Sequence, residues 1–111
     1  MEAIVAGERA GTVGAACDDA GVNVEIVDDR PTGETLERAG IDEATVLVLT
    51  DVSDATAVPV ALERNPDLLT VIYDEIAAPS FVRGQLDLAV DPRLVTPPDL
   101  VAAIRDRAGD H

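Results

Sequence analysis

The chain has 111 residues, 47% of them hydrophobic, and carries 22 acidic against eight basic residues, a formal net charge of −14. This length predicts one domain, residues 1–111, that is large enough to bury a core of its own. So strong a negative charge argues against nucleic acid and anionic membranes as partners, and the absence of lysine excludes reactions that need a lysine amine.

Five short apolar runs alternate with helical patterns along the chain. We expect strands at residues 3–6, 22–27, 45–50, 68–73 and 86–90. We expect helices after residues 7–11, closing at Gly21, and at 34–39, 54–64, 79–85 and 98–107, with Pro59 disturbing its helix and residues 108–111 fraying. The alternation predicts an α/β fold, a Rossmann-like three-layer sandwich around a parallel sheet of five strands in the order 2-1-3-4-5. A ligand would lie over residues 7–11 and 50–53, where the strand order reverses.

The first strand, helix and second strand have the layout of a dinucleotide-binding unit, but the glycine loop is degenerate. In the best register for G-x-G-x-x-G, Ala6, Glu8 and Gly11 occupy the three glycine positions. Glu8 places bulk and negative charge where a pyrophosphate needs bare backbone, whereas Gly11 is expected to let helix and strand pack closely. Asp28 either accepts a hydrogen bond from a ribose hydroxyl or is a solvated strand end.

Eight residues are candidates for binding a cofactor at this point of the sheet. They are Gly7, Glu8, Arg9, Gly11, Asp28, Asp29, Thr50 and Asp51. Arg9 either contacts a phosphate or forms an ion pair with Asp28 or Asp29, and the ion pair is favoured. Because of Glu8, we expect no resident cofactor and at most weak binding of NAD(H) or an adenine nucleotide.

Acidic residues follow several of the expected strands, at Glu8, Asp28, Asp51, Asp74 and Glu75. Such oxygen ligands suit Mg²⁺, Ca²⁺ or K⁺, and paired carboxylates serve in acid–base catalysis. An acidic surface without a specific role gives the same pattern, and we assign no metal site.

The sequence offers no credible catalytic pair. Ser53 and Ser80 are the two serines, the one histidine is His111 at the tail, and Cys17 stands among small residues as a buried apolar side chain. We therefore expect a protein that is not an enzyme. No apolar run approaches the length of a membrane span, so we also expect a cytoplasmic protein without membrane insertion.

The composition resembles that of halophilic archaeal proteins, because it is acidic, lacks lysine and has only 2% aromatic residues. Concentrated salt would screen the repulsion among so many carboxylates. We therefore expect a halophilic archaeal source.

Several short stretches resemble the N-terminal domain of the regulator-of-K⁺-conductance family (RCK), also called the TrkA N-terminal domain. They follow the family's order and cover nearly the whole chain, at residues 6–11, 27–29, 36–44, 48–51, 63–67 and 88–92. The resemblance implies binding of NAD(H) or an adenine nucleotide, a role in gating K⁺ transport, and pairing into a homodimer.

The favoured hypothesis is a small, non-enzymatic regulatory or interaction domain with a degenerate dinucleotide-binding loop. One alternative is an NAD(H) or adenine-nucleotide sensor subunit of a K⁺ transport system. Another is a nucleotide-dependent enzyme that uses the carboxylates at the strand ends. As partners we expect a further protein and a second copy of the chain, contacted through helices because acidic residues on the second strand discourage edge pairing.

Overall fold

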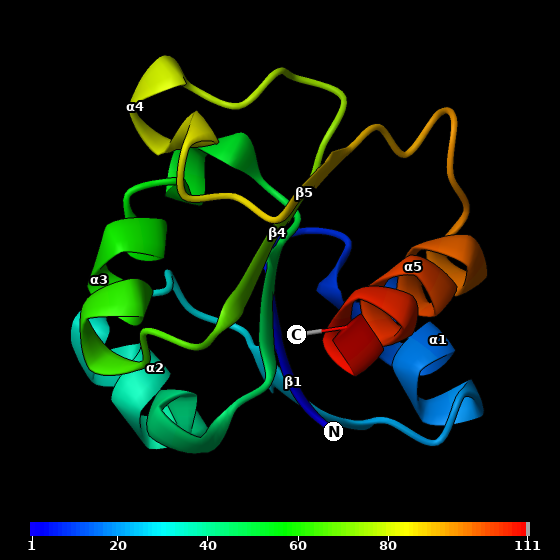
Figure 1. Ribbon diagram of the computed structural model, residues 1–111, viewed down its shortest axis with the longest axis horizontal. Helices are drawn as coiled ribbons and strands as arrows, with labels where there is room; N and C mark the ends of the chain where they lie inside the picture. The colour runs from blue at the N-terminus through cyan, green and yellow to red at the C-terminus, as the bar shows by residue number, and fades with distance from the viewer. Residues whose placement is uncertain (111) are drawn as a thin grey trace.

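A parallel sheet of five strands, in the order β2-β1-β3-β4-β5, runs through the computed structural model, which describes residues 1–110 (Figure 1). The predicted α/β fold and its strand order are confirmed. The strands are β1 (Glu2–Ala6), β2 (Asn23–Val27), β3 (Val46–Leu49), β4 (Leu69–Tyr73) and β5 (Leu88–Val90). Helical connections separate them, because parallel neighbours cannot be joined by a tight turn.

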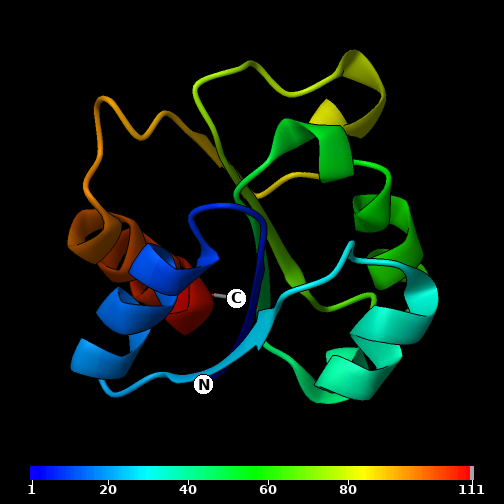
Figure 2. The same cartoon turned by 180° about the vertical axis from the view of Figure 1, so that it is seen from behind.

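Helices cover both faces of the sheet, as Figures 1 and 2 show from opposite sides. One face carries α1 (Ala10–Asp19) and α5 (Pro97–Asp110), and the other carries α2 (Gly33–Ala39), α3 (Ala57–Arg64) and α4 (Ser80–Arg83). Two 3₁₀ turns, η1 (Ile41–Glu43) and η2 (Val52–Asp54), lie beside β3 in the chain. Within residues 1–110, no helix has both the length and the apolar character needed to cross a membrane.

The central strand explains how one apolar run supplies two cores. All four residues of β3 are buried, and successive side chains of a strand point to opposite faces of the sheet. Leu47 and Leu49 join the cluster that packs under α2 and α3, while Val46 and Val48 join the cluster under α1 and α5. A run that is apolar on both faces is typical of a central parallel strand.

Cys17 lies in the cluster between α1 and the sheet, where only 2% of its surface is exposed. Burial raises the pKa of its thiol, so the reactive thiolate is disfavoured. The prediction of a buried apolar side chain is confirmed.

Two helix boundaries differ from expectation by three residues, and the other differences are smaller. The helix expected at 54–64 begins at Ala57, after η2, so Pro59 lies in the first turn of α3, where its missing N–H is not needed. The last helix continues through Asp110 rather than fraying from Ala108, because Ala108 packs against the core under α1 and α5. His111, the end of the expected frayed tail, lies outside the described residues.

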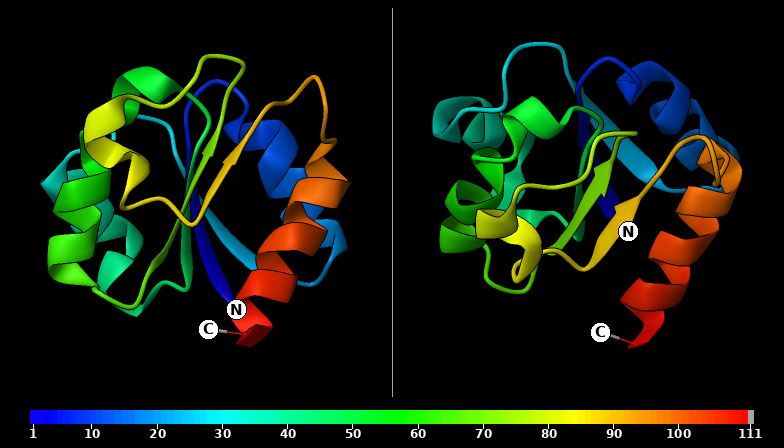
Figure 3. Two further views of the ribbon diagram at one scale, coloured as in Figure 1. Left: turned by 45° about the horizontal axis from the view of Figure 1, so that its top comes forward. Right: turned by 90° about the horizontal axis from the view of Figure 1, so that it is seen from above.

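Because the five strands are parallel, their carboxyl ends meet at one edge of the sheet. Figure 3 shows the loops that follow the strands gathered at this end of the molecule. Side chains at this edge are therefore brought together although they are far apart in sequence.

Candidate functional site

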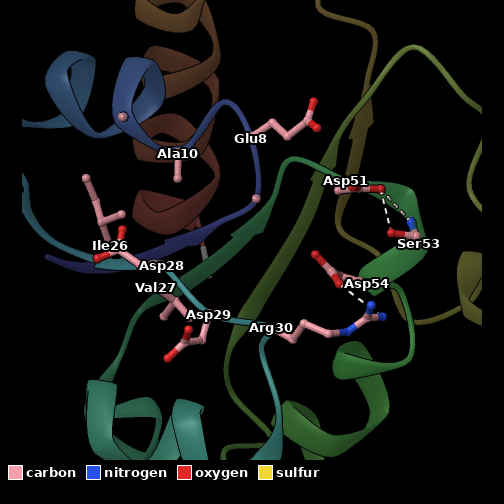
Figure 4. A pocket seen from close by; sticks show the side chains of 12 residues that line it. Glu8, Ala10, Ile26, Val27, Asp28, Asp29, Arg30, Asp51, Ser53 and Asp54 are labelled. Carbon is pink, nitrogen blue, oxygen red and sulfur yellow. Dashed lines mark hydrogen bonds and ion pairs between the residues drawn. The ribbon is translucent and has the colours of Figure 1, made fainter.

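A pocket of about 550 Å³ lies among the loops that follow β1, β2 and β3 (Figure 4). Its lining is Gly7, Glu8, Ala10, Gly11, Ile26, Val27, Asp28, Asp29, Arg30, Asp51, Ser53 and Asp54. The pocket occupies the place where the strand order reverses, between β1 and β3. Five carboxylates and one guanidinium line it, so its surface favours cationic rather than anionic contents.

Six of the eight predicted site residues line this pocket: Gly7, Glu8, Gly11, Asp28, Asp29 and Asp51. Thr50 and Arg9 do not. Arg30 and Asp54 also line the pocket and were not among the predicted residues, although Arg30 directly follows the predicted acidic pair. Ser53 ends the segment 50–53 over which a ligand was expected. Asp54 was expected to begin a helix and lies in η2 instead.

Thr50 is buried, and its hydroxyl is occupied by two hydrogen bonds to backbone groups. Only 1% of its surface is exposed, and its hydroxyl donates to the carbonyl of Ala6 at 2.9 Å and accepts from the backbone N–H of Arg9 at 3.1 Å. These two bonds tie the end of β3 to the loop after β1. Gly7, between Ala6 and Arg9 in that loop, has a φ of 106° and lies against Thr50.

Gly11 does not have the close-packing role expected for it. A Cβ atom at Gly11 would meet open space, whereas one at Gly14 would come within 2.8 Å of Ile26 Cδ1. The expectation was wrong because the glycine-loop register places the close contact one turn too early in the helix. In this chain, α1 approaches β2 through Gly14.

Arg9 forms ion pairs at the end of β4, not with Asp28 or Asp29. Its guanidinium lies 3.9 Å from Asp74 Oδ1 and 3.3 Å from Glu75 Oε2. The expected ion pair therefore exists with different partners. The loop after β1 turns Arg9 away from β2, toward Glu75 in the loop after β4, 66 positions along the chain.

A second arginine extends this set of ion pairs to β5. Arg93 lies 3.3 Å from Glu75 Oε1 and 2.8 Å from Asp91 Oδ2, and its guanidinium lowers the pKa of Asp91. Asp74 also accepts a hydrogen bond from the backbone of Val52 at 2.8 Å. We call Arg9, Asp74, Glu75, Asp91 and Arg93 the strand-end network. It joins the loops after β1, β4 and β5, and the Val52 contact extends it to the loop after β3.

The carboxyl pKa is lowered at Asp51 and raised at Asp54, although the two residues are only three positions apart. Asp51 accepts hydrogen bonds from Ser53 N at 2.9 Å and Ser53 Oγ at 2.7 Å, which lower the pKa of its carboxyl. Burial and the charge of Asp51 raise the pKa of Asp54, whose ion-pair partner Arg30 is 3.8 Å away and 79% exposed. Asp51 is thus held ionised, while ionisation of Asp54 is opposed.

The acidic residues of this edge do not converge on one point. Figure 4 shows Glu8 and Asp29 directing their carboxylates to different sides of the pocket, while Asp51 turns to Ser53 and Asp54 to Arg30. In the described part of the chain, no three acidic, histidine or cysteine side chains are grouped so that they could hold a metal ion. The rim of carboxylates expected from the sequence is therefore divided between the pocket and the strand-end network.

Comparison with known proteins places the chain in a family and identifies its fold. A model described as a family of unknown function (DUF7126) matches residues 3–104. No curated protein matches the sequence.

Three solved structures share the fold. A CheY-like response regulator receiver domain protein from Methanospirillum hungatei is 16% identical, with a TM-score of 0.77 over 98% of this chain and 94% of that one. A putative pilus assembly protein from Burkholderia thailandensis is 19% identical, with a TM-score of 0.74 over 100% and 99%. A response regulator from Burkholderia pseudomallei, solved with a phosphorylated aspartic acid, a calcium ion and citrate, is 16% identical, with a TM-score of 0.72 over 98% and 69%.

The resemblance to the RCK N-terminal domain was wrong. A TrkA-N domain from Escherichia coli superposes with a TM-score of 0.57 at 14% identity, below the values of 0.72 to 0.77 for the proteins above. The matched stretches were short strand ends and helix ends, which parallel α/β folds share. The nucleotide sensing and K⁺ transport that the resemblance implied lose their basis with it.

The expectation of a halophilic archaeal source is also withdrawn, because neither the family nor the similar structures support it. Some of the acidic residues have local structural roles. Asp87 accepts a hydrogen bond from the backbone of buried Thr70 at 2.9 Å, and Asp51 and Asp74 accept backbone hydrogen bonds as described above.

Proposed function

The chain belongs to DUF7126, a family of unknown function, and we propose that it is a small regulatory domain that acts through protein contacts, without phosphorylation or a bound nucleotide. The receiver-like fold supports a regulatory role. The strand-end network carries the rest of the proposal. In it, the acidic residues after β4 and β5 are already paired with Arg9 and Arg93, so the edge is held by internal ion pairs.

Asp51 is the first aspartate after the central strand β3, from which Thr50 separates it, and its surroundings oppose transfer of a phosphoryl group. One of its two carboxylate oxygens, Oδ1, already accepts both hydrogen bonds from Ser53. A phosphoryl group there would add negative charge beside Asp54 and Glu8. Arg30, the cation of the pocket, already faces Asp54.

The test is incubation with acetyl phosphate and Mg²⁺, followed by intact-protein mass spectrometry. We expect the mass to stay that of the unmodified chain. Asp51→Asn and Asp54→Asn are matched variants, since each removes one neighbouring carboxylate without changing side-chain size. A mass gain of one phosphoryl group that Asp51→Asn removes and Asp54→Asn keeps would make the protein a phosphorylated regulator and contradict the proposal.

Nucleotide binding is expected to be weak because Glu8 is only one of several carboxylates that line the pocket. Asp28, Asp29, Asp51 and Asp54 also line the pocket, so an anionic pyrophosphate would meet several carboxylates. We expect titration calorimetry with NADH and ATP to give dissociation constants in the millimolar range or weaker, about −4 kcal/mol. Glu8→Gly should change this little, because four carboxylates remain. Micromolar binding by the unmodified protein would favour the nucleotide-sensor alternative.

Self-association belongs to the same proposal, because a regulatory domain that neither binds a ligand nor is phosphorylated acts through the surfaces that it presents to other proteins. We retain the expectation of a homodimer as part of this proposal.

A further inference from the structure

Residues 76–86 form the longest stretch of the chain without aspartate or glutamate, although one residue in five is acidic overall (22 of 111). They make up the loop after β4, the short helix α4 and the turn that leads to β5. Two of their large apolar side chains are exposed: Ile76 to 65% and Phe81 to 60%. On a surface otherwise dense in carboxylates, this segment offers another molecule exposed apolar groups and carries no carboxylate of its own.

A groove of about 360 Å³ runs between this segment and β5. Ile72 of β4 and Ala89 of β5 are register partners, so their side chains share one face of the sheet and both line the groove. Ala77 and Ala78 form part of its wall. Because α4 has only four residues, it leaves Ala89 exposed at this edge of the sheet, whereas α2 and α3 cover the same face over the inner strands.

The charged side chains that line the groove are mostly acidic. Arg83, the last residue of α4, is the one basic residue among those that line it. Its Nε donates to the carbonyl of Ala78 at 3.0 Å, and within residues 1–110 it has no ion pair with a carboxylate. Glu75, from the strand-end network, lines the same groove and has a side chain that is 45% exposed. Asp74 and Asp91 also line it, and all three carboxylates are already paired with Arg9 or Arg93. An occupant that brings a carboxylate to Arg83 would therefore pair the one charged group of the groove that has no ion pair within residues 1–110.

We propose that the occupant is a second copy of this chain, related by a two-fold axis across the groove. A two-fold interface is self-complementary, so Arg83 of each copy faces Glu75 of the other, and Phe81 of each packs against the alanines of the opposite groove. The acid-free segment of each copy then meets the groove of the other, so each copy brings apolar groups and Arg83, rather than further carboxylates, to the acidic side chains of that groove. The expected helix-mediated dimer thus acquires a surface, built by α4 and β5.

The test is the molar mass in solution, measured by analytical ultracentrifugation over a range of protein concentrations. Salt of about 1 M KCl shortens the screening length to about 3 Å and removes long-range repulsion between copies. We expect the unmodified protein to reach twice the 11.6 kDa chain mass as its concentration rises. Phe81→Glu should raise the dimer dissociation constant by at least about tenfold, as expected for a central aromatic contact.

Two further variants separate this surface from general charge effects. Ala15→Glu adds the same negative charge at an exposed position of α1, on the opposite face of the sheet, and should leave the dimer intact. Arg83→Glu should weaken the dimer at low salt. A protein that remains monomeric at high concentration and high salt overturns the proposal. So does a dimer that Phe81→Glu and Arg83→Glu leave unchanged while circular dichroism shows both variants folded.

Discussion

Replacing Gly7 with alanine is expected to lower the free energy of unfolding by about 3 kcal/mol, a large share of the stability of a small domain. Two causes act together. The φ of 106° lies where side chains other than glycine are strained. A Cβ atom there would also overlap with Thr50 Oγ1 and approach Asp51 N to 3.2 Å. Urea unfolding followed by circular dichroism measures the loss.

Removing the Thr50 hydroxyl separates the steric overlap at Gly7 from the backbone strain at its positive φ. In a Thr50→Ala background the hydroxyl is absent, so Gly7→Ala should cost less than it does in the unmodified chain, with the backbone strain remaining. Thr50→Ala itself loses the hydrogen bond to Arg9 N and should destabilise by about 1–2 kcal/mol. Strictly additive losses in the double variant would show that Gly7 and Thr50 do not interact as described.

Gly7 and Thr50 show how far residue patterns lead at the candidate site. The sequence places both beside the switch point, and the structure does bring them together, but their contact is with each other. A glycine in a loop after a strand has the same one-letter pattern whether the space beside it holds a phosphate or a threonine hydroxyl. Only the register between β1 and β3, which pairs Ala6 with Leu49, decides between these.

The fold was more predictable than the site because its determinants are local. The apolar run of β3 and the alternation of strands with helices are properties of short segments, and handedness rules then restrict the strand order. The ion pair between Arg9 and Glu75 joins residues 66 positions apart, and local spacing does not encode it. The length of α5 was misjudged for a similar reason, since the contact of Ala108 with the core is tertiary.

Replacing Asn65 with aspartate should destabilise the protein by about 3 kcal/mol at neutral pH, although the two side chains have nearly the same shape. The Asn65 side-chain amide donates to the carbonyls of Ile41 at 3.0 Å and Ala44 at 2.9 Å, and so ties the end of α3 to the turn before β3. A carboxylate in its place faces two carbonyl oxygens and donates to neither. The effect is measured as the difference in free energy of unfolding from the unmodified protein.

The pH dependence of this loss identifies its cause. Two carbonyl oxygens oppose ionisation, so the folded-state pKa of the new carboxyl group would lie above its unfolded value. Such a group favours the folded state below its unfolded pKa, and that contribution is lost as the pH rises through the folded pKa. The difference from the unmodified protein should therefore shrink as the pH falls, because a protonated aspartate donates to one of the two carbonyls.

Asn65→Ala is the matched control. It loses both hydrogen bonds without adding a charge, so its cost of about 2 kcal/mol should not follow pH. Equal pH profiles for the aspartate and alanine variants would mean that the carboxylate escapes to solvent and that the two carbonyls do not hold residue 65 in place.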